Sequence, residues 1–155
     1  MFTSIKLVIF DLDGVLVEAK NIHFDALNDA LGDDYAISWN EHLSIYDGLK
    51  TRQKLNMLSD KKGLPKKDHD KIWEAKQRLT LQKLKELKED KKLKTIMSNL
   101  VTDGYKIAVC SNSIRKTCLT VLSKLGIMEY MDLVISNEDV KNSKPHPEMY
   151  WKAIS

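Results

Sequence analysis

Three short runs of consecutive apolar residues, at 7–10, 107–110 and 133–135, stand out in an otherwise mixed sequence. None of them alternates between apolar and polar positions, and polar residues follow each run directly. Continuous apolar runs of this length are typical of strands that are buried on both faces of a parallel sheet. The pattern therefore predicts three parallel strands.

A helical pattern separates the second run from the third. Apolar residues recur there every three or four positions, at Ile114, Cys118, Val121, Leu122 and Leu125. Gly126 follows, where a glycine is expected to end the helix. A strand, a helix and a strand within about 30 residues make a βαβ unit with a right-handed crossover, so we expect an α/β fold.

The segment between the first and second runs is much longer than one crossover needs. Its apolar spacing predicts helices at 22–31, 52–58, 68–87 and 93–101. The apolar faces of the first and third of these are expected to contain Ala26, Leu27, Ala30 and Leu31, and Ile72, Trp73, Ala75 and Leu79. We expect an all-helical cap at residues 16–87, inserted after the first strand of a Rossmann-like parallel α/β core made of residues 1–15 and 88–155.

The composition is that of an ordinary soluble globular protein, with 43% hydrophobic and 30% charged residues. The net charge of +3 comes mostly from lysines between 61 and 94, and interleaved acidic residues favour a solvated helix face over a nucleic-acid surface. The two cysteines form no metal or disulfide pattern, and the apolar run that ends at Phe10 is too short for a signal peptide or membrane span. We therefore expect a cytoplasmic protein without nucleic-acid or membrane partners.

The residues that follow the predicted strands carry the candidate chemistry, because ligands of parallel α/β sheets bind at the carboxyl ends of the strands. Asp11 and Asp13 follow the first strand. Such a pair could cap a helix or bind structural calcium, but it can also face one reacting centre, where one carboxylate attacks and the other handles a proton. Gly14 would let the backbone come close to a ligand.

Ser111 follows the second strand directly, and Lys144 follows the third across a short loop. Taken singly, Ser111 is more typical of a cap or a turn, and Lys144 of the protein surface. Together with Asp11 they provide a nucleophile, a hydroxyl donor and an ammonium group. Phosphoryl transfer requires these groups, because its catalysis depends on positioning and on neutralising charge.

These segments resemble motifs of the haloacid dehalogenase superfamily. Residues 10–15 (FDLDGV) resemble its first motif, residues 109–113 (VCSNS) its second, and residues 143–148 (SKPHPE) its third, in the branch of sugar-phosphate phosphatases and β-phosphoglucomutases. The resemblance continues through the insert, with the first cap segment at Glu18 and 23–28, the substrate loop at 48–52 and the third cap helix at 75–77.

The resemblance implies a role for each matching residue of the core. Asp11 would be the nucleophile that forms an aspartyl-phosphate, and Asp13 the acid/base that protonates the leaving alcohol and then activates water. Mg²⁺ would be held by a carboxylate oxygen of Asp11 and the main-chain carbonyl of Asp13. Ser111 and the Asn112 amide would bind the phosphoryl oxygens, and Lys144 would offset the negative charge. An aspartate at position 13 argues against the dehalogenases of this superfamily, which need no metal.

In the cap, the resemblance implies that four residues bind substrate: His23, Thr51, Arg52 and Lys76. Arg52 and Lys76 are expected to face the active end of the sheet, because a phosphorylated substrate needs nearby positive charge. The alternative is that both are ordinary surface residues.

The superfamily has a fourth motif, an acidic pair after a fourth strand that completes the Mg²⁺ shell. The sequence up to Ser155 contains no such pair; Glu138 and Asp139 follow the third strand, where the geometry would be wrong. In this superfamily the fourth strand lies beside the first. We therefore expect the first strand to be an open apolar edge, through which the 155-residue chain self-associates unless it is only marginally stable alone.

The leading hypothesis is a Mg²⁺-dependent phosphatase that acts on a small phosphorylated metabolite, in particular a sugar phosphate. One alternative is a β-phosphoglucomutase-like phosphomutase, whose cap would reposition a bisphosphorylated sugar. The other is a non-catalytic chain that binds a phosphate compound or a partner protein. Sequence alone leaves these three hypotheses open.

Overall fold

Three parallel strands form one sheet in the computed structural model, which describes residues 5–155. They are β1 (Leu7–Phe10), β2 (Lys106–Cys110) and β3 (Leu133–Ile135), in the order β1-β2-β3. The register pairs Ile9 with Ala108, and Val109 with Val134. The predicted strands and the α/β class are confirmed, and residues 107–110 of the central strand are completely buried.

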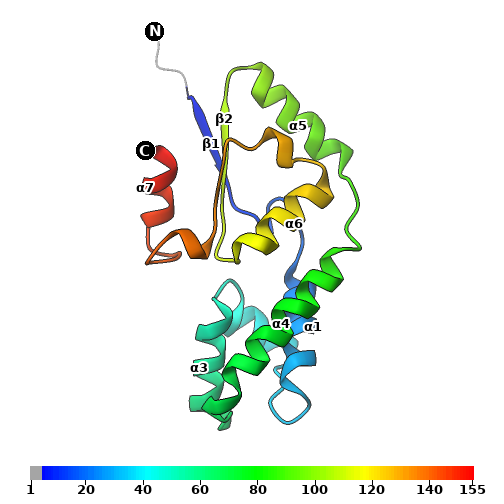
Figure 1. The fold of residues 1–155 in the computed structure, drawn as a ribbon, viewed down its shortest axis with the longest axis vertical. Helices are drawn as coiled ribbons and strands as arrows, with labels where there is room; N and C mark the ends of the chain where they lie inside the picture. The colour runs from blue at the N-terminus through cyan, green and yellow to red at the C-terminus, as the bar shows by residue number, and fades with distance from the viewer. Residues whose placement is uncertain (1–4) are drawn as a thin grey trace. The chain divides into compact units, whose positions relative to one another are not determined.

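Helices cover both faces of this sheet. They are α5 (Lys91–Thr102), α6 (Arg115–Leu125) and α7 (Glu148–Ile154), and the same part of the chain contains the 3₁₀ turns η3 (Met128–Tyr130) and η4 (Asn137–Asp139). Figure 1 shows α5 and α6 on one side of the strands and α7 on the other. Met149 of α7 is fully buried in a cluster with Cys110 and Ile135. The strand ends are therefore held from both sides.

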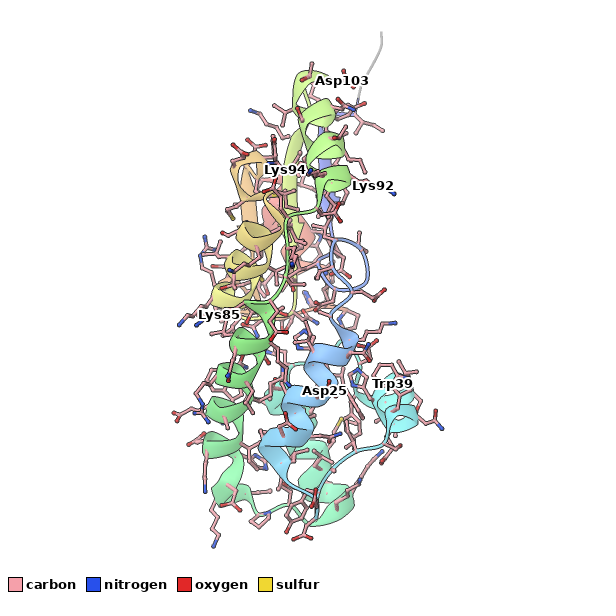
Figure 2. The ribbon with its side chains drawn as sticks, turned by 90° about the vertical axis from the view of Figure 1, so that its right-hand side faces the viewer. Asp25, Trp39, Lys85, Lys92, Lys94 and Asp103 are labelled. Atoms are coloured by element: carbon pink, nitrogen blue, oxygen red, sulfur yellow. The ribbon has the colours of Figure 1, made fainter. Side chains whose placement is uncertain are left out.

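The ends of two core helices follow from local sequence. Helix α6 ends at Gly126, which has a left-handed φ of 80° and satisfies the carbonyl of Leu122, as the sequence predicts. Helix α5 begins after Asp90, whose carboxylate accepts a hydrogen bond of 3.1 Å from the Leu93 amide. On α5, Lys94 (Figure 2) lies 2.6 Å from a carboxylate oxygen of Glu89, one of the interleaved acidic residues.

Residues 19–84 form a compact helical unit of their own, which we call the cap. Its elements are α1 (Lys20–Leu31), α2 (Trp39–Glu41), the π-helical turn η1 (His42–Tyr46), α3 (Thr51–Lys62), the 3₁₀ turn η2 (Lys66–Asp68) and α4 (His69–Leu84). Helices α1 and α4 pack against each other, and Leu27, Leu55 and Leu58 are fully buried in the cap core. No helix within residues 5–155 is both long and apolar enough to cross a membrane.

The buried face of α4 differs from the predicted one. Ile72 is buried as expected, but Ala75 and Leu79 are half-buried, and the buried positions form a stripe at every fourth residue: Ile72, Lys76, Thr80 and Leu84. Two of these are polar, so the hydrophobic pattern could not reveal them. Their burial is tolerated because Thr80 Oγ1 donates to the Lys76 carbonyl at 2.7 Å and Lys76 Nζ reaches His23.

The segment 39–46 was not predicted to be helical. A capping box begins it: the Glu41 amide donates to Ser38 Oγ at 3.1 Å, and the Ser38 amide donates to Glu41 Oε1 at 2.9 Å. Trp39 (Figure 2) stacks edge-on against Phe24, with ring centroids 5.1 Å apart. Aromatic packing, rather than a hydrophobic periodicity, therefore holds this short helical segment in the cap.

Candidate active site

Asp11 lies directly after β1, at the carboxyl end of the sheet. Its side chain is 49% exposed, and its Oδ1 accepts hydrogen bonds from the Leu12 amide at 2.7 Å and from Lys144 Nζ at 2.9 Å. Within residues 5–155, no hydrogen bond reaches Oδ2. One carboxylate oxygen is thus fixed by the protein while the other is available for chemistry.

Lys144 connects the ends of two strands. Besides Asp11, its ammonium donates to the carbonyl of Cys110, the last residue of β2, at 2.6 Å. Its side chain is only 17% exposed, and the Tyr150 ring centroid lies 5.9 Å away. An ammonium group has three donors, so two hold the strand ends and the third can still bind an anion. The structure therefore brings together Asp11 and Lys144, which are 133 residues apart in the sequence.

Asn112 positions the backbone of Lys144. Its Oδ1 accepts from the Lys144 amide at 2.9 Å, and its Nδ2 donates to the Lys144 carbonyl at 3.1 Å. Asn137, which the sequence did not single out, donates from Nδ2 to the Asn112 carbonyl at 3.0 Å. The side chain of Asn112 is thus committed to the lysine loop.

Ser111 is buried at the carboxyl end of β2. Its amide donates to the Ile135 carbonyl at 3.0 Å, and its Oγ accepts from the Ser113 amide at 3.1 Å. A hydroxyl group that accepts at its oxygen can still donate its own proton. The turn therefore fixes the Ser111 oxygen at the end of the strand.

Asp13 and Gly14 lie in a tight turn after Asp11. The Gly14 amide donates to the Val17 carbonyl at 2.7 Å, and the Val17 amide donates back to the Leu12 carbonyl at 3.1 Å. Gly14 has a φ of 80°, which glycine adopts without strain. This turn folds the chain back immediately after the two carboxylates. It therefore keeps Asp13 close to the end of β1.

Glu138 and Asp139 have structural roles. Glu138 accepts from the Arg115 amide at 2.8 Å, and Asp139 Oδ2 accepts from the Ser136 amide at 2.8 Å and from its hydroxyl at 2.9 Å. Burial alone would raise the pKa of Asp139, but the hydrogen bonds from Ser136 and the nearby Arg115 charge lower it. These carboxylates cap a turn and the start of α6.

The two cysteines are buried and unsuited to nucleophilic chemistry. Burial raises the pKa of the Cys118 thiol to about 11 and also raises the pKa of Cys110. Both thiols therefore stay protonated at neutral pH. Of the nucleophiles at the carboxyl ends of the strands, the exposed carboxylate of Asp11 is the most accessible.

The oxygens at the end of β1 fit a hard divalent cation. Within residues 5–155, no three or more side chains of His, Cys, Asp and Glu form a group that could hold a metal ion. Mg²⁺, however, usually keeps several waters and uses one or two carboxylates together with substrate phosphate. A carboxylate oxygen of Asp11 and the main-chain carbonyl of Asp13 could supply protein oxygens to such an ion.

In the cap, His23 and Lys76 lie in contact. Lys76 Nζ is 3.1 Å from His23 Nδ1, and Lys76 is 4% exposed. Because an ammonium group can only donate, the histidine accepts at Nδ1. The structure therefore joins two of the four predicted substrate-binding residues into one pair.

Thr51 and Arg52 are the first two residues of α3, and Thr51 is buried. Arg52 Nη1 lies 2.5 Å from Asp70 Oδ1, and its guanidinium carbon lies 5.0 Å from the Trp73 ring centroid. The sequence pattern did not indicate Asp70 as a partner of Arg52. The spacing of Asp70 and Trp73, one turn apart on α4, was the only available signal.

Comparisons with known proteins show the family and the fold of this chain. The sequence profile described as haloacid dehalogenase-like hydrolase matches residues 8–155. A phosphorylated carbohydrates phosphatase from Thermotoga maritima is 28% identical over 150 residues, which cover 92% of this chain and 66% of that protein. A haloacid dehalogenase-like hydrolase domain-containing protein from Arabidopsis thaliana is 24% identical over 184 residues, which cover 97% of this chain and 58% of that protein. The chain thus spans less than two thirds of the length of either relative.

Solved structures share the fold at low sequence identity. A β-phosphoglucomutase from Clostridium difficile superposes with a TM-score of 0.82 at 22% identity, covering 97% of this chain and 70% of that one. CbbY from Rhodobacter sphaeroides, solved in complex with xylulose-1,5-bisphosphate, gives 0.84 at 19% identity and covers 97% of this chain and 72% of its own. With a family profile that matches nearly the whole sequence, this chain belongs to the haloacid dehalogenase-like hydrolase family.

Proposed function

We propose that this chain carries the nucleophile and charge-neutralising residues of a Mg²⁺-dependent phosphatase that acts on a small phosphorylated metabolite, in particular a sugar phosphate. The observation that carries the proposal is the contact of 2.9 Å between Lys144 Nζ and Asp11 Oδ1 at the carboxyl end of the sheet. It places a carboxylate with one free oxygen beside a partly buried cation. The phosphatase name of the Thermotoga maritima relative supports the same activity.

The proposed reaction has two steps. In the first, Asp11 Oδ2 attacks phosphorus, the ester P–O bond breaks, and Asp13 gives its proton to the leaving alcohol. In the second, Asp13 takes a proton from water, the water oxygen attacks the phosphorus of the aspartyl-phosphate, and the Asp11 carboxylate is regenerated as phosphate leaves.

Charge neutralisation is shared among the residues around Asp11. Lys144 and the hydroxyl of Ser111 would bind phosphoryl oxygens as negative charge develops on them. Bound Mg²⁺ would supply further positive charge to the phosphate and to Asp11. Lys144 also keeps the Asp11 carboxylate in one orientation, because its second donor is anchored to the end of β2.

A phosphomutase is the second candidate, and the His23–Lys76 contact of 3.1 Å favours it. A mutase must hold a sugar that carries two phosphates and present each of them to Asp11 in turn. A histidine bound to a buried lysine provides a firm polar group for this in the cap. Incubation with β-glucose 1-phosphate and a trace of glucose 1,6-bisphosphate separates the candidates, because a mutase yields glucose 6-phosphate and a phosphatase yields inorganic phosphate.

The proposed function is tested with Asp11→Asn. We expect this variant to lose hydrolysis of p-nitrophenyl phosphate while keeping the circular dichroism and melting temperature of the wild type. Asp13→Asn should slow turnover and accumulate a phosphorylated protein that intact-mass spectrometry detects. The matched control is Asp103→Asn, which changes an exposed carboxylate at the end of α5 (Figure 2) and should leave activity unchanged.

Two results would contradict the proposal. Hydrolysis that survives in Asp11→Asn would exclude Asp11 as the nucleophile. A wild-type chain that hydrolyses nothing with or without Mg²⁺ would favour the non-catalytic alternative.

A further inference from the structure

We propose that Asp70 is a positioning residue that occupies Arg52 in the free cap and competes with the substrate for it, so that it sets the affinity for substrates with a second anionic group. This inference rests on the proposed function and on the substrate-binding role that the family resemblance implies for Arg52. It concerns the cap alone. The contacts that carry it come from α3 and α4.

Two residues of α4 hold the Arg52 guanidinium from different sides. Asp70 Oδ1 lies 2.5 Å from Nη1, and the Trp73 ring centroid lies 5.0 Å from the guanidinium carbon. Asp70 and Trp73 are three residues apart on a helix, so they present one face to Arg52. Trp73 is half-buried and packs against the cap core, which makes it a fixed platform.

The two contacts have different consequences for binding. Stacking on Trp73 leaves the edges of the guanidinium open, and these edges carry the N–H groups that bind phosphate in pairs. The Asp70 carboxylate occupies one of them. A phosphate that binds the edge containing Nη1 must therefore displace Asp70, whereas it can bind there while Arg52 remains stacked on Trp73.

Exposure makes this displacement easy. The side chain of Asp70 is 84% exposed and that of Arg52 is 50% exposed, so water screens their attraction. Exposed ion pairs of this kind bias an equilibrium by roughly 1.5- to 5-fold. A phosphate carries more charge than a carboxylate and binds the guanidinium with two hydrogen bonds, so it can replace Asp70. Asp70 then acts as an internal competitor that weakens binding by this factor.

The expected signature is a change in KM without a change in kcat. Asp70→Asn removes the competing charge and keeps the shape of the side chain, so KM for glucose 1,6-bisphosphate should fall by roughly 1.5- to 5-fold. KM for p-nitrophenyl phosphate, which has no second anionic group, should stay the same. The difference between wild type and variant should shrink at high ionic strength, because salt screens the pair.

Trp73→Leu is the second variant. It keeps an apolar side chain against the cap core but removes the stacking platform, so KM for the bisphosphate should rise while KM for the aryl phosphate stays the same. Asp60→Asn, an exposed change on α3, is the matched control and should alter neither value. Melting temperatures of all variants establish that the cap remains folded.

The inference can be judged separately from the proposed function. Inorganic phosphate is titrated into the chain while the Arg52 side-chain N–H signals are followed by NMR, a measurement that needs no turnover. Asp70→Asn should lower the dissociation constant by the same factor. An unchanged or higher constant in Asp70→Asn, or the absence of any phosphate response at Arg52, would overturn the inference even if the chain is an active phosphatase. If the chain proves inactive but Arg52 responds as expected, the proposed function fails and the role of Asp70 stands.

Discussion

His42 shows how a single buried residue makes the cap sensitive to pH. The side chain is completely buried beside Phe24 and Trp39, and within the described residues neither ring nitrogen has a hydrogen-bond partner. Burial lowers its pKa, the charge of Lys54 lowers it further, and Asp47 partly opposes them. The folded cap therefore favours the neutral form of the His42 side chain.

This pKa shift predicts a loss of stability in mild acid. An unfolded histidine has a pKa near 6.5, whereas the folded His42 has a lower one. As the pH falls below about 6.5, the unfolded chain binds a proton that the folded chain does not, so the free energy of unfolding decreases until the folded pKa is reached. We expect His42→Phe, which keeps an aromatic ring in place, to reduce this decrease in urea unfolding measured between pH 7 and pH 5.

The control for His42 is an exposed histidine. His146→Phe should leave the pH dependence of the wild type largely unchanged, because His146 is exposed. Equal pH profiles for the wild type and His42→Phe would refute the role given to His42. Comparing variants in this way cancels the contribution of the carboxylates, which also titrate in this range.

At the scale of single residues, sequence identified groups that stand directly after strands. The juxtaposition of Asp11 and Lys144 could be expected, because parallel strands bring their carboxyl ends to one edge of the sheet. The hydrogen bonds from the Asn112 side chain to the Lys144 backbone, and the pairing of Arg52 with Asp70, could not be expected from the sequence. Both depend on which loop or helix lies opposite, and a hydrophobic pattern contains no information on that.

At the scale of elements, α7 is the helix that closes one face of the sheet. Met149 is its only completely buried residue and packs in a cluster with Cys110 and Ile135, while Ile154 is 70% exposed. We expect Met149→Ala to lower the free energy of unfolding by about 2 to 4 kcal/mol, because it removes buried atoms and leaves a cavity. Ile154→Ala should change it by less than about 0.5 kcal/mol.

Urea unfolding of both variants measures this difference. A similar loss in Met149→Ala and Ile154→Ala would mean that α7 does not hold the sheet through its buried face. Because Met149 lies behind Cys110, whose carbonyl binds Lys144, a cavity there should also reduce turnover. The same helix thus links the core to the candidate site.

Elements with a strong pattern were predicted from sequence to within a few residues. The three strands, α6 with its Gly126 cap, and the helices α1, α3, α4 and α5 all lie where continuous apolar runs or helical spacing placed them. The short helical segment at residues 39–46 and the buried stripe of α4 were not predicted, because neither follows from a hydrophobic pattern. Their positions are set by polar capping and by buried polar groups that find partners in the fold, such as Lys76 with His23.

At the scale of the whole molecule, β1 is the edge of the sheet formed by the described residues. Within residues 5–155, its strand partner is β2. The Lys106 amide donates to the Lys6 carbonyl at 2.8 Å, so the alternation of a parallel ladder directs the backbone of Val8 towards β2 and that of Leu7 and Ile9 to the open side. An apolar strand with exposed amides and carbonyls is a template for pairing with another chain.

This edge predicts self-association of the 155-residue chain. Leaving backbone groups unpaired costs on the order of 1 to 3 kcal/mol each when they are buried in apolar surroundings, so pairing two β1 edges in a symmetric dimer should be favourable. We expect light scattering to give a mass above 17.8 kDa that falls on dilution. In the associated state, hydrogen exchange at the Leu7 and Ile9 amides should slow.

Two substitutions separate the edge from the fold. Leu7→Pro removes an outward amide at the start of β1 without removing a ladder bond to β2, so it should weaken association while the monomer stays folded. Val8→Asp places a charge in the strand and should disrupt folding and association together. A wild-type chain that is monomeric at all concentrations and unfolds cooperatively at high temperature, with Leu7 and Ile9 already protected, would show that the edge is covered from within. Light scattering would then give the same mass for Leu7→Pro and the wild type. That result would refute the predicted contact between the β1 edges of two chains.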